Sequence, residues 1–191
     1  MLWHAQGNLH CEYAHVYARY GNKIAPKRDF VPENATLGLD DLDSRILTVL
    51  QEDGRLSNVE LADRVGLSPS PCLRRVKRLE EEGYIAGYKA RVDRRRLGLG
   101  MTVFVGVKVD GHRDANAKAF TEAMHKLPEV VACHMVSGET DFLLEVVVAD
   151  LNAYDAFLSR TLLLMPMIRD IRSNFAIRTV KADGPLPVSG R

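Results

Sequence analysis

Apolar residues recur at helical spacing within the stretch Leu56–Gly83, LSNVELADRVGLSPSPCLRRVKRLEEEG. A first short helix begins at the capping box formed by Ser57 and Glu60. Gly66 stands where a residue with positive φ ends a helix. The inner side of this helix would be formed by three apolar residues: Leu61, Ala62 and Val65. The pattern therefore predicts a short capped helix followed by a tight turn.

A second helix is expected directly after that turn. Ser68 suits its N-cap, and Pro69 suits the first helical position, where a missing N–H costs nothing. At 100° per residue one side is apolar, with Cys72, Leu73, Val76 and Leu79. The other side is basic, with Ser70, Arg74 and Arg78 flanked by Arg75 and Lys77. Such a pair is typical of a helix-turn-helix, here about Asn58 to Lys77, which places its second helix in the major groove of DNA.

The basic side of the second helix has two interpretations. A helix face rich in charge is usually just a solvated face. Its place on the second helix of a capped, tightly turned pair favours DNA binding. Under that interpretation six residues would contact phosphates or bases: Ser68, Ser70, Arg74, Arg75, Lys77 and Arg78.

The segments on either side extend this unit. A helix is expected at about Asp40–Asp53, and its apolar face would be Leu42, Ile46, Val49 and Leu50. Tyr84–Val92 is expected to form a short hairpin or wing, followed by a basic linker over Asp93–Gly100. The arginines of this linker, Arg94, Arg95 and Arg96, would either touch phosphate or belong to a solvated hinge. Residues 1–38 lack periodicity and are assigned no element.

The second half of the chain alternates strands and helices. Strands are expected at 102–109, 130–136 and 142–148, with a last one within 171–180. Helices are expected at 116–127 and 151–164. The order β-α-β-β-α-β predicts a ferredoxin-like α+β domain with both helices on one face of an antiparallel sheet. The other face would lack a cover, so we expect a dimer.

Composition and charge restrict the function further. The chain has no apolar run long enough for a membrane span, and its first residues do not resemble a secretory signal. Its three cysteines, Cys11, Cys72 and Cys133, are too far apart for a disulfide framework or a metal clip, which favours a cytoplasmic protein.

The net charge of +1 hides an uneven distribution. Between Arg64 and Arg96 there are ten Lys and Arg against four Asp and Glu, whereas from Met101 to the end there are ten against eleven. Positive charge is therefore concentrated around the helix-turn-helix, as expected of a DNA-binding module joined to a neutral domain.

From Leu39 to about Lys181 the chain resembles the bacterial Lrp/AsnC (feast/famine) transcription regulators. The resemblance rests on LDDLDSRIL, on DGRLSNVELADRVGLSPSPCLRRVKRLEEEGYI and on CHMVSGETDFLL, and is closest to the leucine-responsive branch. It implies a DNA-binding domain with linker over 39–100, an effector-binding and oligomerisation domain over 101–183, and a tail over 184–191. It also implies dimers that associate into tetramers or octamers and bind an amino acid between dimers. The extension 1–38 has no counterpart in the family.

The family's G-x-x-D turn corresponds to Gly138 and Asp141. The resemblance therefore implies an effector contact from four residues: Gly138, Glu139, Thr140 and Asp141. Gly138 would let the backbone approach a ligand, and Asp141 could pair with the ammonium group of an amino acid. The same residues are also common in a plain β-hairpin turn.

The sequence thus predicts a sequence-specific transcription regulator that responds to an amino acid such as leucine. An architectural protein that wraps DNA with little sequence preference is the alternative. An enzyme is not expected, because no metal-spaced cluster, phosphate loop or nucleophile–base set is evident. Cys133 and His134 are neighbours in a strand, so they point to opposite faces and form no catalytic pair. No cofactor is expected beyond the amino-acid effector.

Overall fold

The computed structural model describes residues 38–110 and 114–188 of the chain. It divides into two compact units. The unit that contains the predicted effector-binding domain, named the sensing unit after that prediction, runs from Asp93 to Arg178. The helical unit comprises the described residues up to Val92, together with the C-terminal tail from Thr179 onward. Each unit has a hydrophobic core of its own.

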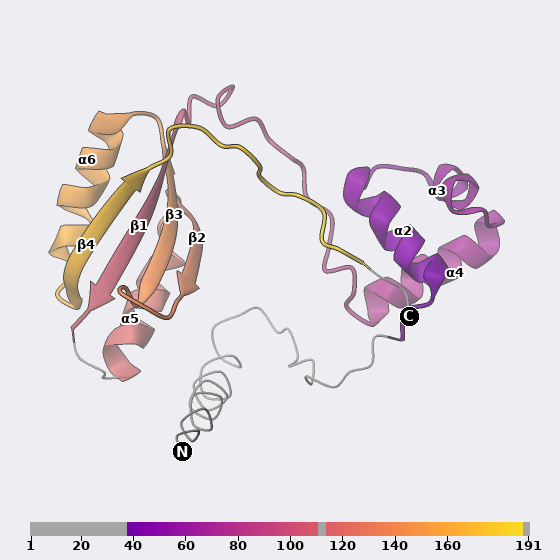
Figure 1. Ribbon diagram of the computed structural model, residues 1–191, viewed down its shortest axis with the longest axis horizontal. Coiled ribbons are helices and arrows are strands. Elements are labelled where there is room, and N and C mark those ends of the chain that lie inside the picture. Colours follow the sequence, from indigo (N-terminus) through magenta and orange to yellow (C-terminus); the bar gives the residue numbers. More distant parts are fainter. Residues whose placement is uncertain (1–37, 111–113, 189–191) are drawn as a thin grey trace, which may run out of the picture. The chain divides into compact units, whose positions relative to one another are not determined.

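The helical unit consists of α2 (Asp41–Glu52), α3 (Asn58–Val65) and α4 (Pro69–Glu81) (Figure 1). The predicted capping box of α3 is present: Ser57 N–H donates to Glu60 at 2.8 Å, and Glu60 N–H donates back to the Ser57 hydroxyl at 3.3 Å. Gly66 ends α3 in the left-handed conformation. These local signals make the helix boundaries readable from sequence, because each cap satisfies backbone groups that the helix leaves unpaired.

The core of the helical unit comes from all three helices: Ile46, Leu61, Ala62, Val65, Cys72 and Leu79. One residue expected in this core lies elsewhere, since Leu73 is 43 % exposed. The side of α4 that contacts α2 and α3 follows Cys72, Val76 and Leu79, at spacings of four and three residues. Leu73 lies beside this narrow stripe and faces solvent.

The expected wing is not present. Across the described segment Tyr84–Val92 no strand forms. The segment packs back on the helices instead: Ile85 N–H donates to the Leu79 carbonyl at 3.0 Å, and the Tyr88 hydroxyl donates to Glu80 at 3.0 Å. An isolated two-stranded hairpin is marginally stable, and here Tyr84 and Ile85 lower their exposure by packing against the helical core.

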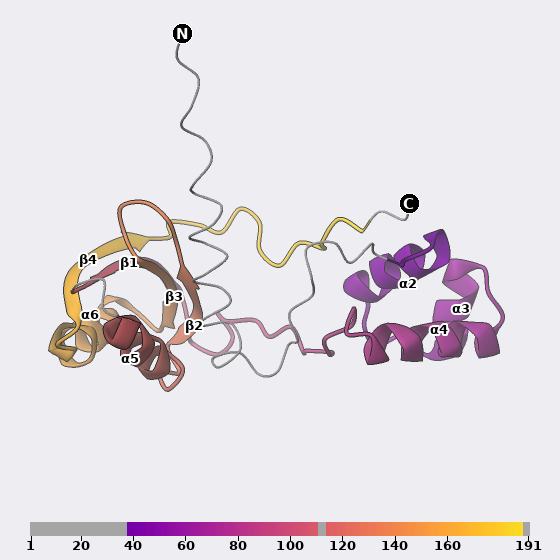
Figure 2. The same ribbon diagram turned by 90° about the horizontal axis from the view of Figure 1, so that it is seen from below.

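The sensing unit has the predicted ferredoxin-like arrangement. Its strands are β1 (Met101–Val109), β2 (Val130–Met135), β3 (Phe142–Val148) and β4 (Ile168–Phe175). They form one antiparallel sheet in the order β2-β3-β1-β4. Helices α5 (Asp114–Met124) and α6 (Leu151–Arg160) cover the same face of this sheet (Figure 2). The α+β class predicted from the sequence is therefore confirmed.

Successive side chains of β1 point to opposite faces of the sheet, and this alternation decides which of them enter the core. Val103, Val105 and Val107 are fully buried beneath the helices, whereas Phe104 is 40 % exposed on the opposite face. Two boundaries differ from the expectation. Helix α6 ends at Arg160, and the rest of the expected helix 151–164 forms a separate 3-10 turn over Leu162–Leu164. Strand β4 spans Ile168–Phe175, so it begins and ends earlier than the expected range 171–180.

Candidate DNA-binding surface and effector turn

The outward side of α4 carries part of the predicted DNA-binding set. Ser70, Arg74 and Lys77 are exposed there. Ser68 occupies the N-cap; among the described residues it makes no side-chain cap hydrogen bond, so its hydroxyl can reach a phosphate. Asn58 of α3 donates its side-chain amide to the Pro69 carbonyl at 2.8 Å, which fixes the start of α4 against α3.

The other two predicted residues, Arg75 and Arg78, bind within the helical unit. Arg75 donates to Asp43 at 2.8 Å and to Asp40 at 2.6 Å. Arg78 donates to the second carboxylate oxygen of Asp43. The side chain of Asp43 is only 1 % exposed, so its charge depends on these two arginines for compensation. Helical periodicity predicts Arg78 on the outward side of α4 and Arg75 at its flank, but in the structure both guanidinium groups turn toward α2.

Asp43 is the residue of this surface that the sequence analysis missed. It lies three residues before Ile46 and four before Leu47, on the side of α2 that faces the core. An acidic residue at an inward position, opposite two arginines of α4, was the available signal. Asp40 belongs to the same network: hydrogen bonds from the Asp43 backbone N–H and from Arg75 lower the pKa of its carboxyl group.

The predicted surface therefore divides by role. Ser68, Ser70, Arg74 and Lys77 point to solvent, where they can donate to phosphates or base edges. Arg75 and Arg78 join α4 to the first turn of α2 through ion pairs. These ion pairs fix the rotation of α4 about its axis, and with it the direction in which Arg74 and Lys77 point.

The predicted effector turn lies on the sheet face opposite the helices. Gly138 has φ +120°, a conformation that favours glycine. Thr140 packs on Gly106 of β1, where an added Cβ would come within 2.8 Å of the Thr140 methyl carbon. Asp141 binds the end of β1 twice: its N–H donates to the Val107 carbonyl at 3.0 Å, and its carboxylate accepts from Val109 N–H at 2.9 Å.

The acidic residue of the turn also has a partner within the sensing unit. Glu139 accepts a hydrogen bond from Arg172 of β4, and Arg172 lies 3.7 Å from the carboxylate of Asp170. The side chains of Glu139 and Arg172 are 71 % and 50 % exposed, so this ion pair is open to water. Sequence reasoning did not include Arg172, because only the sheet order brings β4 next to the turn that precedes β3.

The turn therefore gathers charges of both signs on one face. Asp141 and Glu139 offer carboxylates and Arg172 offers a guanidinium group. A free amino acid is a zwitterion that needs an anion for its ammonium group and a cation for its carboxylate. Both requirements can be met here, although each charged group already has a partner in the protein.

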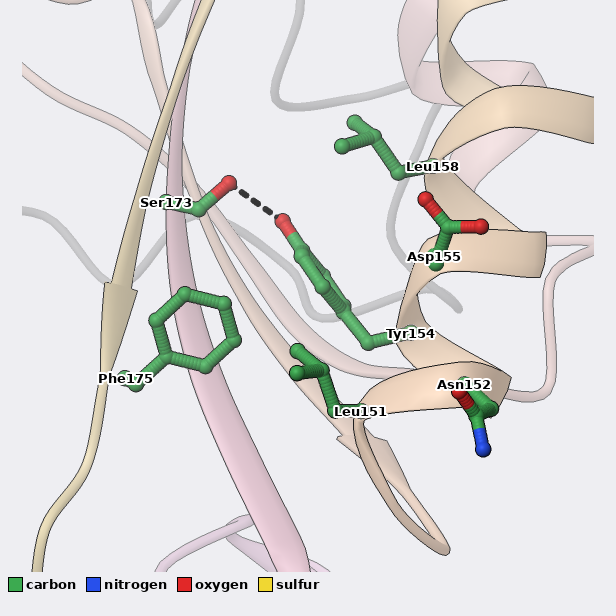
Figure 3. Close-up of a pocket in the computed structure, with 7 residues that line it drawn as sticks. All are labelled: Leu151, Asn152, Tyr154, Asp155, Leu158, Ser173 and Phe175. Atoms are coloured by element: carbon green, nitrogen blue, oxygen red, sulfur yellow. Dashed lines mark hydrogen bonds between the residues drawn. The ribbon is translucent and has the colours of Figure 1, made fainter.

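A cavity of about 500 Å³ lies elsewhere in the sensing unit, between α6 and β4 (Figure 3). Tyr154 points into it from α6, hydrogen bonds to Ser173 of β4 and meets the ring of Phe175 edge to face at 5.3 Å. None of the predicted effector residues lines it. The Tyr154–Ser173 bond and the burial of Tyr154 are sufficiently explained by the packing of α6 on the sheet.

In ranges 38–110 and 114–188 no group of three His, Cys, Asp or Glu side chains could hold a metal ion. In the same ranges no helix is long and apolar enough to cross a membrane. Burial raises the pKa of the Cys133 thiol to about 11, so this thiol stays protonated at neutral pH.

Two family models match the chain. A winged helix-turn-helix DNA-binding model matches residues 39–86, and the Lrp/AsnC ligand binding domain matches residues 102–186. The leucine-responsive regulatory proteins of Klebsiella pneumoniae and Escherichia coli K12 are each 43 % identical over 153 residues, which cover 80 % of this chain and 93 % of theirs. The chain belongs to the Lrp/AsnC family of transcription regulators.

Solved structures of Lrp/AsnC-type regulators have the same fold. A transcriptional regulator from Neisseria meningitidis, determined as an L-Met complex, is 42 % identical with a TM-score of 0.76, and the alignment covers 78 % of this chain and 96 % of that one. An AsnC family regulator from Agrobacterium tumefaciens is 42 % identical with a TM-score of 0.74, over 78 % of this chain and 97 % of that one. In this Lrp/AsnC chain the DNA-binding model spans α2–α4, and the ligand-binding model includes the turn 138–141.

Proposed function

We propose that this Lrp/AsnC regulator reads specific DNA sequences through the outward side of α4. The observation that carries the proposal is the division of its arginines. Arg75 and Arg78 are held by the buried Asp43, while Arg74 and Lys77 project to solvent from a helix whose rotation is thereby fixed. A fixed helix is what base readout needs, because bidentate contacts to base edges tolerate little displacement.

The sensing domain, in this proposal, binds a small apolar amino acid, with leucine as the first candidate. Relatives 43 % identical to the chain are named leucine-responsive, and a structural neighbour was solved with L-Met. The turn from Gly138 to Asp141 would hold the effector. Asp141 would take the ammonium group, and Arg172 would take the carboxylate after leaving Glu139.

Assembly through the open sheet face completes the proposal. Phe104 and Leu143 lie on the face that α5 and α6 do not cover, and a second copy would remove them from water. Dimers would present two copies of α4 to half-sites ~34–36 Å apart or a multiple of that distance. Further association into tetramers or octamers would place the turn near a neighbouring dimer. The protein would act in the cytoplasm, on the nucleoid, without catalysing a reaction.

Binding measurements on the Arg74→Ala variant test the DNA-binding part. DNA would first be selected from a random pool by the wild-type chain, and affinity then measured by fluorescence anisotropy at one fixed salt concentration. Loss of an arginine–guanine contact should weaken binding by ~1–3 kcal/mol, roughly 5- to 150-fold. Arg45→Ala, which removes an exposed arginine of α2, serves as the matched control and should change affinity little. Unchanged affinity in Arg74→Ala would place the wrong side of α4 in the groove.

The architectural alternative predicts a different result in the same assay. Binding that rests on phosphates alone gives a steep salt dependence and a small ratio of specific to nonspecific affinity. Sequence-specific regulators bind their sites roughly 10³-fold or more tighter than random DNA. A selected pool without a consensus, bound no better than random DNA, would favour the architectural function.

A further inference from the structure

The C-terminal tail, residues 179–188, is attached to the helical unit by specific contacts. Leu186 N–H donates to the side-chain carbonyl of Gln51 at 2.6 Å, and the Gln51 amide donates back to the Leu186 carbonyl at 3.2 Å. Val188 packs against the core of the three helices. One glutamine side chain of α2 thus pairs with both backbone groups of a single tail residue, as a neighbouring strand would.

The sequence of the tail suits this docking. Pro185 and Pro187 flank Leu186, and each proline fixes its own φ near −65°. Leu186 precedes a proline, which restricts it to extended conformations. The docked segment therefore loses less conformational entropy when it binds, which favours docking through two hydrogen bonds and one apolar contact.

Chain connectivity gives this docking a consequence. The chain leaves the helical unit at Val92, forms the whole sensing unit, and returns to the helical unit at Thr179. The first connection is the covalent passage of the chain from Val92 to Asp93, within residues 89–100, which form no helix or strand. The second connection exists only while Leu186 stays on α2 and Val188 stays against the helical core, because without these contacts the tail would be a free end.

We propose that the C-terminal tail is a second tether, which docks on α2 and limits the motion of the DNA-binding unit relative to the sensing unit. The proposal rests on the proposed function, since the benefit appears when two copies of α4 bind one DNA. A doubly connected unit samples fewer orientations. The second half-site is then bound at a higher effective concentration. Gln51 lies on the same helix as Asp43, so the tail holds the helix against which α4 is fixed.

Two variants remove the tether by different routes. One is a chain truncated after Asp183. The other is Gln51→Ala in the full-length chain, which removes both hydrogen bonds to Leu186 but leaves the tail in place. Glu52→Ala, which truncates the exposed neighbour of Gln51, is the matched control. Each protein would be measured on DNA with two half-sites and on DNA with one.

We expect both tether variants to lose about 10-fold in affinity for the two-site DNA, and to keep single-site affinity within about twofold. Glu52→Ala should match the wild type on both DNAs. Unchanged two-site affinity would overturn the proposal. An equal loss on both DNAs would also overturn it, because the tail would then only stabilise the helical fold.

Backbone ¹⁵N relaxation gives a readout independent of DNA. The amides of α2–α4 should tumble faster, relative to those of the sheet, once the tether is removed. Identical tumbling in the wild type and both variants would overturn the proposal. A wild-type chain that binds no DNA would instead contradict the proposed function, and the relaxation data would still decide whether the tail restrains the unit.

Discussion

The helix α4 and the turn 138–141 are both charged surfaces, but their charges have different partners. In α4 the two arginines that face α2 are bound to Asp43, and Arg74 and Lys77 remain exposed. In the turn, the carboxylate of Asp141 accepts from Val109 N–H, and Glu139 is paired with Arg172. Under the proposed function, DNA would therefore meet groups that already face solvent, whereas an amino acid would have to replace internal partners.

This difference suits the two tasks. A recognition helix works best when it is rigid before DNA arrives, because its contacts then cost little ordering. An effector site must change when the ligand binds, since a ligand that leaves the protein unchanged cannot shift its assembly or DNA affinity. Exchange of the Glu139–Arg172 pair for effector–protein pairs would supply such a change.

The largest effect is expected from Asp43→Ala, which tests whether the ion pairs of Asp43 hold α4 rigidly. Removing a buried carboxylate that compensates two arginines should destabilise the helical unit. Loss of one partner of a buried ion pair costs ~3–5 kcal/mol, and we expect about 2–3 kcal/mol because both arginines are partly exposed. Urea denaturation followed by circular dichroism measures the cost. Asp63→Ala, at an exposed acidic residue of α3, is the control. A similarly small cost for both variants would show that Asp43 does not fix α4.

The next effect concerns Asp141→Asn, which keeps an oxygen for Val109 N–H but removes the charge. If Asp141 pairs with the effector ammonium, affinity for leucine should fall by ~1.5–3 kcal/mol, roughly 10- to 150-fold. Isothermal titration calorimetry measures the loss, with Asp110→Asn, at the exposed residue directly after β1, as control. DNA binding without effector should survive. Equal leucine affinity in the variant and the wild type would mean that Asp141 only shapes the turn.

A smaller change of opposite sign is expected from Glu139→Gln. The substitution removes the carboxylate that competes with the effector for Arg172. Exposed ion pairs contribute ~0.2–1 kcal/mol, so leucine affinity should rise by up to about fivefold. The same calorimetric titration detects it. A decrease in affinity would show that Glu139 itself contacts the effector and that Arg172 does not hold the carboxylate.

Local sequence signals predicted the helices and strands well, but they did not predict the internal partners of the charged residues. The capping box Ser57–Glu60, Gly66 and the alternation of β1 act over a few residues, so their outcome is legible in the sequence. The partners of the charged residues are not local: Asp43 and Arg78 are 35 residues apart, and Glu139 and Arg172 are 33 apart. Helical periodicity placed Arg78 on the outer side of α4, but its long side chain reaches around the helix to a buried charge.

The expected wing failed for a related reason. Tyr84–Val92 has residues suited to a strand. A strand also needs a neighbouring strand or a packing surface that stabilises it, and the local sequence pattern does not show whether one is present. The contacts of Ile85 and Tyr88 with α4 depend on a helical surface that exists only in the folded unit.

The smallest expected effect is the pH dependence of the Asp40 contact, at the exposed margin of the Asp43 network. Hydrogen bonds from the Asp43 backbone N–H and from Arg75 lower the pKa of Asp40 below its ordinary value of 3.8. A carboxyl group with a lowered pKa in the folded state stabilises that state above its unfolded pKa, and the contribution is lost as pH falls through the folded value. Asp40 is 51 % exposed, so solvent screening should limit the contribution to about 0.5 kcal/mol.

Wild type and Asp40→Asn should therefore differ slightly in free energy of unfolding at pH 7 and converge below pH 3.8. Urea denaturation of the wild type and of Asp40→Asn, repeated at each pH between these limits, measures the two free energies of unfolding. Equal free energies of unfolding at pH 7 would mean that Asp40 acts only as an N-cap, because asparagine caps helices as well as aspartate does. A difference that persists at acid pH would mean that the substitution acts through something other than the charge of Asp40.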